Sequence, residues 1–158
     1  MLPTPSNDVQ QKIVDDIHEY GLHVLSVLED EEGVDFSYSV GLWRTYGHPE
    51  ILIIGLGSNI SHWIINTIAN RIKNRDETMT TDQSYAGFLE GFECLFFEVS
   101  KTQCAEFVHM AMWFYEQEEF PVLQLVYPST EGHFPWEKGA SASFQSWQPV
   151  LNSEDLAG

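Results

Sequence analysis

One run of six apolar residues, Ile51-Leu-Ile-Ile-Gly-Leu56, constrains the fold of this chain more than any other feature. Successive side chains of a strand point to opposite faces of a sheet, so a strand that is apolar throughout is buried on both faces. We therefore expect residues 51–56 to form a central strand inside the protein.

Further strands are predicted around this one. Residues 35–43 alternate in character, with Phe36, Tyr38, Val40 and Leu42 sharing one face. Residues 22–28 also have strand character, and the acidic turn 29–33 between the two segments predicts a hairpin. Residues 88–99 contain another strand, and residues 121–127 form the last one.

Apolar residues at helical spacing predict about three helices. The first spans residues 7–20, with Asn7 as its N-cap and Gly21 at its C-terminal end. The second begins at Ser58 or Asn59 and runs to about Asn74 along a stripe of isoleucines. The third opens at Ser100 and turns Phe107, Met110, Ala111 and Phe114 inward. The order of elements predicts an α+β fold, a mostly antiparallel, curled or barrel-like sheet with these helices packed on it.

The length of 158 residues fits a single domain. We expect residues 1–6 to be a frayed lead-in and residues 128–158 to be a tail pinned on the body. No apolar run approaches the roughly 20 residues of a membrane span, and the first residues do not have the pattern of a secretion signal. These features predict a cytoplasmic protein, in which Cys94 and Cys104 act as small buried hydrophobic residues.

The chain is strongly acidic, with 24 Asp and Glu against 7 Lys and Arg and a formal net charge of −17. Phosphate contacts dominate nucleic-acid affinity, so this charge excludes direct nucleic-acid binding and also disfavours anionic membranes. Acidic clusters at residues 29–32 and 116–119 have two interpretations. They are solvated turns and helix ends, or they form part of an interface for a basic protein partner.

The segment Gly41-Leu-Trp-Arg-Thr-Tyr-Gly-His-Pro-Glu50 concentrates an imidazole, a carboxylate, a guanidinium and two aromatic rings. If Pro49 continues into the next strand, His48 and Glu50 share one face. They could then act as acid and base, or as two ligands of a metal. In the structural alternative, Gly47 and Pro49 shape the turn, His48 binds a backbone carbonyl, and Glu50 or Arg44 pairs with a nearby group.

A second segment, Gly132-His-Phe-Pro-Trp-Glu137, places an indole beside a carboxylate and an imidazole. Trp136 would form a wall for a flat ligand, or it would anchor the tail on the core. The candidate binding pocket predicted from both segments is lined by Tyr38, Trp43, Arg44, His48, Glu50, Trp136 and Glu137.

No other motif identifies a cofactor. Gly55-Leu-Gly-Ser-Asn-Ile60 resembles a dinucleotide fingerprint only weakly, because Ile60 stands at the third glycine. The helix start near Ser58 could accept a small anion. P-loop, HExxH and GxSxG motifs are absent, and the scattered histidines favour no metal site. We predict neither a cofactor nor a metal.

Phe36-Ser-Tyr-Ser-Val-Gly-Leu-Trp43 with Tyr46-Gly-His-Pro-Glu-Ile51 forms one set of motifs, and Gly132-His-Phe-Pro-Trp-Glu137 with Gln148-Pro-Val-Leu151 forms a second. Both sets resemble a bacterial family of unknown function, DUF4262. The first set corresponds to its YTVGL…GHPE core and the second to its FPWE…QP ending, and the likeness spans about residues 20–151. Tyr127-Pro-Ser129 departs from the Trp-Pro-Asp of the family, and residues 75–87 depart from its glycine-bearing loop. The segments that carry the resemblance are residues 20–24, 36–43, 46–51, 54–56, 122–128, 132–137 and 148–151.

The family likeness implies no activity, so the functional hypothesis depends on the residues. The favoured hypothesis is a non-catalytic module that binds a small molecule or a protein. The alternative is an enzyme, or an enzyme subunit, that uses His48 and Glu50 on a small molecule, on a fold that resembles a flavin-binding split barrel.

Overall fold

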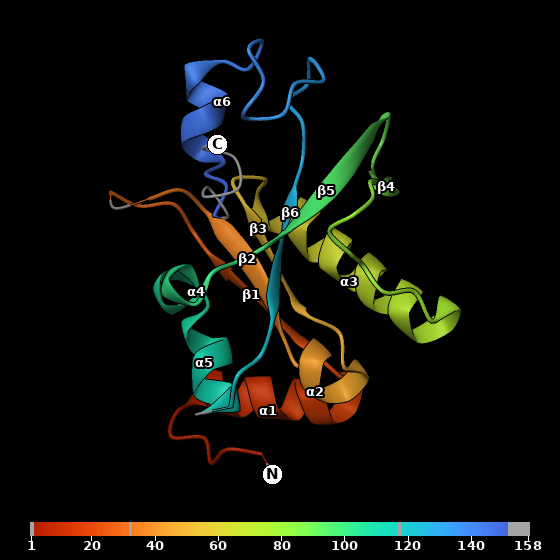
Figure 1. Ribbon diagram of the computed structural model, residues 1–158. Coiled ribbons are helices and arrows are strands. Elements are labelled where there is room, and N and C mark those ends of the chain that lie inside the picture. Colours follow the sequence, from red (N-terminus) through yellow and green to blue (C-terminus); the bar gives the residue numbers. More distant parts are fainter. Residues whose placement is uncertain (1, 32, 117, 152–158) are drawn as a thin grey trace.

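The computed structural model describes residues 2–31, 33–116 and 118–151, and these form a sheet flanked by helices (Figure 1). The strands are β1 (His23–Val27), β2 (Phe36–Val40), β3 (Glu50–Ile54), β4 (Tyr85–Leu89), β5 (Phe92–Glu98) and β6 (Val122–Val126). The helices are α1 (Asp8–Tyr20), α2 (Leu42–Tyr46), α3 (Ser58–Arg75), α4 (Lys101–Phe107), α5 (His109–Tyr115) and α6 (Ala142–Trp147). None of these helices has the length and apolar character needed to cross a membrane.

The sheet is mixed and open. Its strand order is β1-β2-β3-β6-β5-β4. β3 and β6 pair in parallel, whereas the other neighbouring strands pair antiparallel. The expected α+β class is confirmed, but the expectation of a mostly antiparallel, curled or barrel-like sheet was wrong, because the sheet is mixed and does not close. The long connection from β3 through α3, the β4–β5 hairpin, α4 and α5 allows β6 to enter beside β3 in the same direction, as parallel pairing requires. An open sheet also gives no support to the split-barrel analogy.

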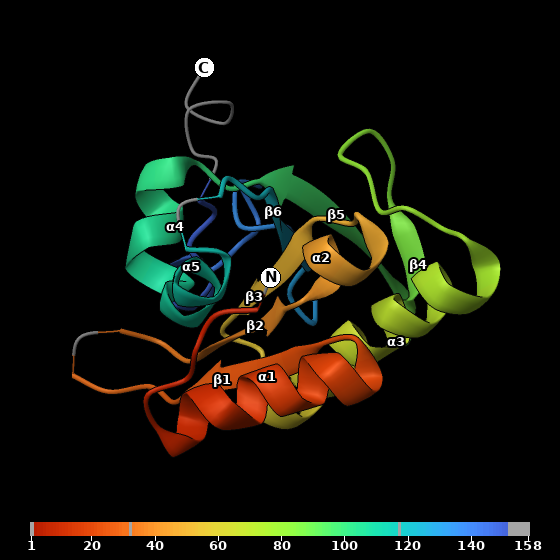
Figure 2. The ribbon, with the colours of Figure 1, turned by 90° about the horizontal axis from the view of Figure 1, so that it is seen from below.

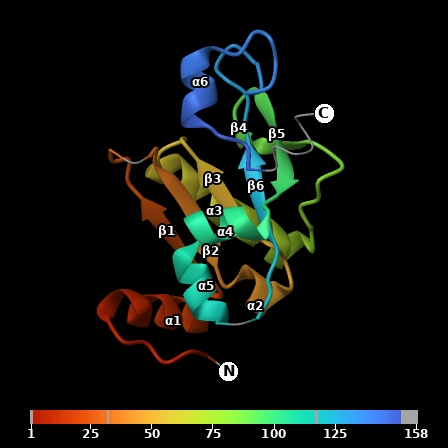
Figure 3. The ribbon, with the colours of Figure 1, turned by 60° about the vertical axis from the view of Figure 1, so that its left-hand side comes forward.

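β3 is the central strand that the sequence predicted, and all five of its residues are buried. Ile51 and Ile53 face α3 in one hydrophobic cluster, while Leu52 and Ile54 belong to a second cluster on the opposite face. The helices α4 and α5 lie on one side of the sheet and α3 on the other (Figure 2). Figure 3 shows α4 and α5 in front of the strands. The apolar run thus holds two cores together, one on each face.

Several elements differ from the prediction, because their ends depend on distant contacts. Strand β2 stops at Val40, and the chain then enters α2, where a strand and a loop were expected. The predicted third helix is divided at Val108 into α4 and α5, and α6 was not predicted. The segment 88–99 belongs to the β4–β5 hairpin. The N-cap of α3 is Gly57 instead of Ser58 or Asn59. Helix α1, with its Asn7 cap, agrees with the prediction.

Two glutamine side chains bind the segment after α6 to the region of β6. The Gln148 amide accepts a hydrogen bond from the Tyr127 N–H at 3.0 Å and donates one to the Tyr127 carbonyl at 2.8 Å. The Gln124 amide likewise accepts from the Leu151 N–H and donates to the Pro149 carbonyl, both at 2.8 Å. Each amide therefore reproduces the two hydrogen bonds of a strand pairing. The predicted tail also included residues 152–158, which lie outside the described residues.

Candidate functional site

The Glu50 side chain, at the start of β3, is completely buried. Its carboxylate oxygens lie opposite the first turn of α2, which has no capping side chain of its own. The backbone enters this helix through Gly41, whose φ of 113° is a left-handed conformation that favours glycine. The carboxylate accepts hydrogen bonds from Ser39 Oγ (2.7 Å), the N–H groups of Gly41 (2.9 Å), Leu42 (3.1 Å) and Trp43 (3.3 Å), and the Tyr115 hydroxyl.

This arrangement makes Glu50 a helix cap supplied from a neighbouring strand. The first N–H groups of a helix lack partners within it, and a carboxylate there also interacts favourably with the helix dipole. Burial raises the pKa of the Glu50 carboxyl, and the hydrogen bonds from Tyr115, Ser39 and the backbone oppose that rise. The pKa of the Tyr115 hydroxyl is raised by burial and by the Glu50 charge. Both carboxylate oxygens are engaged within the protein.

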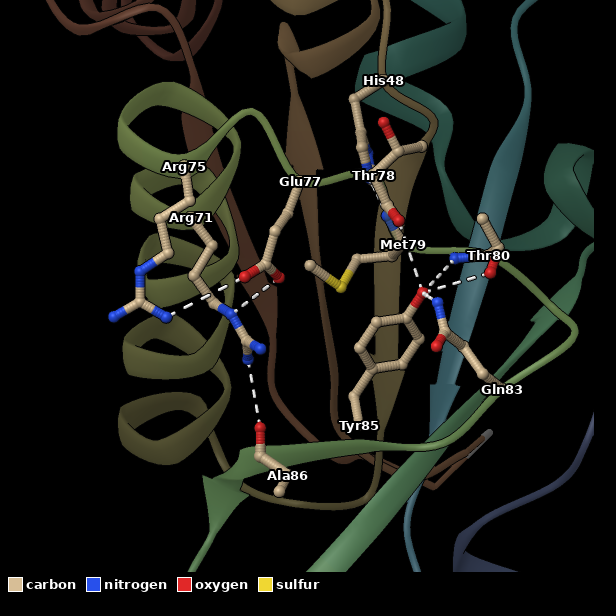
Figure 4. A network of polar contacts seen from close by, with 10 residues as sticks. All are labelled: His48, Arg71, Arg75, Glu77, Thr78, Met79, Thr80, Gln83, Tyr85 and Ala86. Carbon is tan, nitrogen blue, oxygen red and sulfur yellow. Dashed lines mark hydrogen bonds and ion pairs between the residues drawn. The ribbon is translucent and has the colours of Figure 1, made fainter.

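His48 occupies a different network, which holds the chain after α3 (Figure 4). Its ring is 2% exposed, and its Nε2 accepts a hydrogen bond from the Met79 N–H at 2.9 Å. Nδ1 therefore carries the proton, which it donates to the Pro49 carbonyl at 2.8 Å. Burial lowers the pKa of His48, so the imidazole is neutral at pH 7. Both ring nitrogens are occupied by backbone groups.

The Tyr85 hydroxyl completes this network on the same segment. It accepts hydrogen bonds from the Thr80 N–H at 2.8 Å and the Gln83 amide at 2.9 Å. Figure 4 shows this hydroxyl at the centre of the loop, below Met79. Together, His48 and Tyr85 fix the polar segment whose conformation the sequence did not predict.

The structure distributes the predicted site residues over separate places. Among the described contacts, no hydrogen bond or ion pair joins His48 to Glu50. The buried Tyr38 hydroxyl accepts from the Met110 N–H at 3.0 Å, and burial raises its pKa to about 12. Trp43 and Arg44 are exposed on α2.

Trp136 and Glu137 belong to the loop between β6 and α6, which lies at the opposite end of the sheet from α2 (Figure 1). The Trp136 ring stacks on Phe134 with centroids 5.0 Å apart and meets Phe97 edge-on at 5.5 Å. Glu137 accepts a hydrogen bond from the Phe134 N–H at 3.0 Å. The seven predicted residues therefore do not line one pocket.

A cavity of about 390 Å³ lies instead where the parallel strands β3 and β6 end. Residues from four segments enclose it: the turn after β3, the β4–β5 turn, the loop after β6 and helix α6. Its lining residues are Gly55, Leu56, Leu89, Glu90, Phe92, Tyr127, Pro128, Ser129, Thr130, Glu131, Gly139, Ser141, Phe144 and Trp147.

Close packing between β3 and α6 shapes one wall of this cavity. A Cβ atom at Gly55 would lie 2.2 Å from the Trp147 carbonyl oxygen, so only glycine allows this approach. The Tyr127 hydroxyl donates a hydrogen bond to the Ile54 carbonyl at 2.8 Å, which fixes its ring at the end of both strands. Phe144 meets the rings of Tyr127 and Trp147 edge-on, with centroids 5.9 and 5.5 Å apart. The cavity is therefore bounded by rigid aromatic side chains.

The charged side chains among the described lining residues are two carboxylates, Glu90 and Glu131, and both are exposed. The helix start near Ser58, which was predicted to accept an anion, instead faces a carboxylate, because the Gly57 N–H donates to Asp35 at 2.8 Å. The electrostatic character of this end of the sheet is thus acidic.

Sequence reasoning missed the cavity although it noted two of the segments that form it, residues 55–60 and 122–128. The missing information was that β3 and β6 are neighbours. Among the described residues, no three His, Cys, Asp or Glu side chains come together as a metal site. Cys94 and Cys104 are unpaired and buried, as expected, and burial raises the pKa of Cys94 to about 12.

Comparison with known proteins identifies the family. The family model described as a domain of unknown function, DUF4262, matches residues 16–141. No curated protein and no solved structure matches the chain. The match covers most of the chain and includes every segment that carries the resemblance except residues 148–151. The chain therefore belongs to the DUF4262 family.

Proposed function

We propose that this protein is a non-catalytic module that binds a small molecule in the cavity at the ends of β3 and β6. The observation that carries the proposal is the position of the cavity. In open, doubly wound α/β sheets, ligands bind in the crevice outside the carboxyl ends of the parallel strands, and the cavity lies at the corresponding place beside the parallel pair β3 and β6. Its volume of about 390 Å³ falls within the roughly 300–1,000 Å³ of small-molecule pockets. Its walls are mainly apolar and aromatic, with polar groups at the rim.

The alternative of an enzyme that uses His48 and Glu50 has less support. A general acid or base needs an atom that can reach the substrate proton. Both nitrogens of His48 and both oxygens of Glu50 are bound to groups of the protein itself. We assign these two residues structural roles in holding α2 and the segment around Met79.

The binding proposal is tested by screening a fragment library with ligand-observed NMR. Thr130 is exposed at the cavity wall, so a Thr130→Trp variant fills the cavity with little change to the core. Thr81→Trp is the matched control, because Thr81 is an exposed loop residue outside the lining. Fragments should bind the wild type and the control but not Thr130→Trp. Equal binding to both variants, or the absence of any binding fragment, would refute the proposal.

A second candidate function, the binding of a basic protein segment, is favoured by a groove of about 860 Å³ beside β1. Apolar side chains form part of this groove, and Leu28 beside them is 73% exposed. Carboxylates contribute the charge, which agrees with the net charge of −17. The residues that line the groove are Val27, Leu28, Glu29, Asp30, Glu31, Gly33, Val34, Phe36, Glu106, Phe107, Ser146 and Pro149.

This second candidate is tested with a fluorescent, lysine-rich amphipathic peptide followed by anisotropy. The double variant Glu29→Gln/Glu31→Gln should weaken binding, and the effect should diminish as salt increases. The control Glu116→Gln/Glu118→Gln removes the same charge from an exposed site elsewhere. If both double variants weaken binding equally, the attraction arises from net charge and the groove is not the binding site.

A further inference from the structure

We infer that the cavity selects an organic cation, namely a small amine attached to an apolar ring. This inference rests on the proposed function and specifies the chemical class of the ligand. It follows from two properties of the same cavity, the character of its rings and the sign of its charges.

The first property is the aromatic wall. Phe92, Tyr127, Phe144 and Trp147 line the cavity, and Trp147 is 43% exposed, so part of its indole remains open to a ligand. The Tyr127 hydroxyl donates its proton to the Ile54 carbonyl and the residue is buried, so Tyr127 supports the wall from within the core. The face of an aromatic ring attracts a cation, and indole does so most strongly. Tyr127 and Phe144 are 3% and 2% exposed, so the indole of Trp147, with the half-buried Phe92, is the part of this wall that can contact the apolar body and the ammonium group of an amine.

The second property is the charge at the rim. Glu90, at the turn between β4 and β5, and Glu131, in the loop after β6, line the cavity from two different segments. Lys138 precedes the lining residue Gly139 but is not itself part of the described lining. A ligand carboxylate or phosphate would meet two like charges, and no Lys or Arg belongs to the lining in the part of the chain that the structure describes. An ammonium group would meet carboxylates, in the attractive field of an acidic protein.

The Ser129 and Ser141 hydroxyls are engaged by backbone groups of the cavity wall. Ser129 Oγ accepts hydrogen bonds from the N–H groups of Glu131 and His133, and Ser141 Oγ accepts one from the Phe144 N–H. Each hydroxyl thus acts as an acceptor that orders a loop or a helix start. Both lone pairs of Ser129 Oγ are engaged by these N–H groups, so the acceptors left for the donors of an ammonium group are chiefly the Glu90 and Glu131 carboxylates.

The test compares three probes that share a phenyl ring and differ in charge: 2-phenylethylamine, 2-phenylethanol and phenylacetate. Binding is measured by isothermal titration calorimetry at neutral pH. Two exposed carboxylates and one accessible ring together predict about tenfold tighter binding of the amine than of the alcohol. Phenylacetate should bind more weakly than the alcohol. A rise in salt should weaken only the binding of the amine.

Two variants locate the source of the preference. Glu90→Gln/Glu131→Gln should reduce the affinity for the amine about fivefold and leave the affinity for the alcohol unchanged. Glu93→Gln is the matched control, because Glu93 follows the same turn but contacts Ser84 outside the cavity lining. A double variant that behaves like this control would overturn the role of the two carboxylates.

The outcomes separate this inference from the proposed function. If the alcohol or the acid binds as tightly as the amine, the cavity still binds ligands but the inferred class is wrong. If none of the three probes binds, and the Thr130→Trp screen also finds no cavity ligand, the proposed function fails as well. A preference for the amine that persists in Thr130→Trp would place the cation site outside this cavity and refute the inference.

Discussion

Replacing Glu50 by glutamine tests the most unusual feature of the core, the carboxylate that caps α2. Glutamine has the same shape but presents an NH₂ group in place of one oxygen. If this group replaces Oε1, it faces the N–H of Leu42, and if it replaces Oε2, it faces the N–H groups of Gly41 and Trp43. In either orientation at least one buried backbone donor loses its acceptor.

The magnitude follows from counting these donors. One buried, unsatisfied N–H costs about 1–3 kcal/mol, and the remaining hydrogen bonds lose the reinforcement of a charged acceptor. We therefore expect Glu50→Gln to lower the free energy of unfolding by roughly 2–4 kcal/mol, a large fraction of the 5–15 kcal/mol of an ordinary domain. Glu98→Gln, at the exposed end of β5, should change it by less than about 0.5 kcal/mol.

The assay is urea unfolding followed by circular dichroism at pH 7, with Tyr115→Phe and the double variant included. Because Tyr115 donates to Glu50, the two substitutions should not be additive, and the coupling should exceed about 0.5 kcal/mol. A Glu50→Gln protein within about 1 kcal/mol of the wild type, with an unchanged dependence on urea, would refute the assignment of Glu50 as the cap.

Three further predictions concern His48, Gly55 and Cys94. Burial lowers the pKa of His48 in the folded protein, so protonation of this residue favours the unfolded state. The contribution of neutral His48 to the free energy of unfolding should be fully present above the unfolded pKa of about 6.5 and be lost as the pH falls through the folded pKa. When the free energy of unfolding is measured with a chemical denaturant between about pH 5 and 7, it should depend less on pH in His48→Gln than in the wild type. The same slope of free energy against pH in both proteins would contradict this. Gly55→Ala should destabilise the protein by at least about 2 kcal/mol, because φ at Gly55 is 80° and the added methyl would collide with the Trp147 carbonyl. Thermal unfolding will measure this loss, and an unchanged midpoint would show that α6 can move away without cost. Burial raises the pKa of the Cys94 thiol to about 12, so at pH 8 this thiol should not react with a disulfide reagent until the protein is unfolded. Rapid labelling of Cys94 in the native protein would show instead that this part of the core opens readily.

The parts of the fold that the sequence predicted correctly are those encoded by neighbouring residues. Helix α1 follows from a repeat of apolar residues and a local cap, and β3 follows from a continuous apolar run. Helix α2 could not be predicted in the same way. The alternation of β2 continues through Leu42 and Trp43, and the helical turn that forms instead is capped by the Glu50 carboxylate from the next strand.

The candidate site was harder to predict for the same reason. The residue types at positions 48 and 50 indicated chemistry, but their hydrogen-bond partners, such as Met79 and Tyr115, come from distant segments. The cavity depends on the parallel pairing of β3 with β6, and a strand that is buried on both faces has no pattern that reveals its neighbour or its direction. The residues were visible in the sequence, whereas their proximity was not.

The position of β6 also has a consequence for how the chain is made. β3 is complete at Ile54, yet the strand that covers one of its edges is not synthesised until residues 122–126. During translation a strand that is apolar except for Glu50 is therefore made before its partner, and its row of unpaired peptide groups could pair with other chains. We expect nascent or truncated chains that lack β6 to depend on chaperones and to aggregate, even though they already contain the N-terminal hairpin and the longest helix.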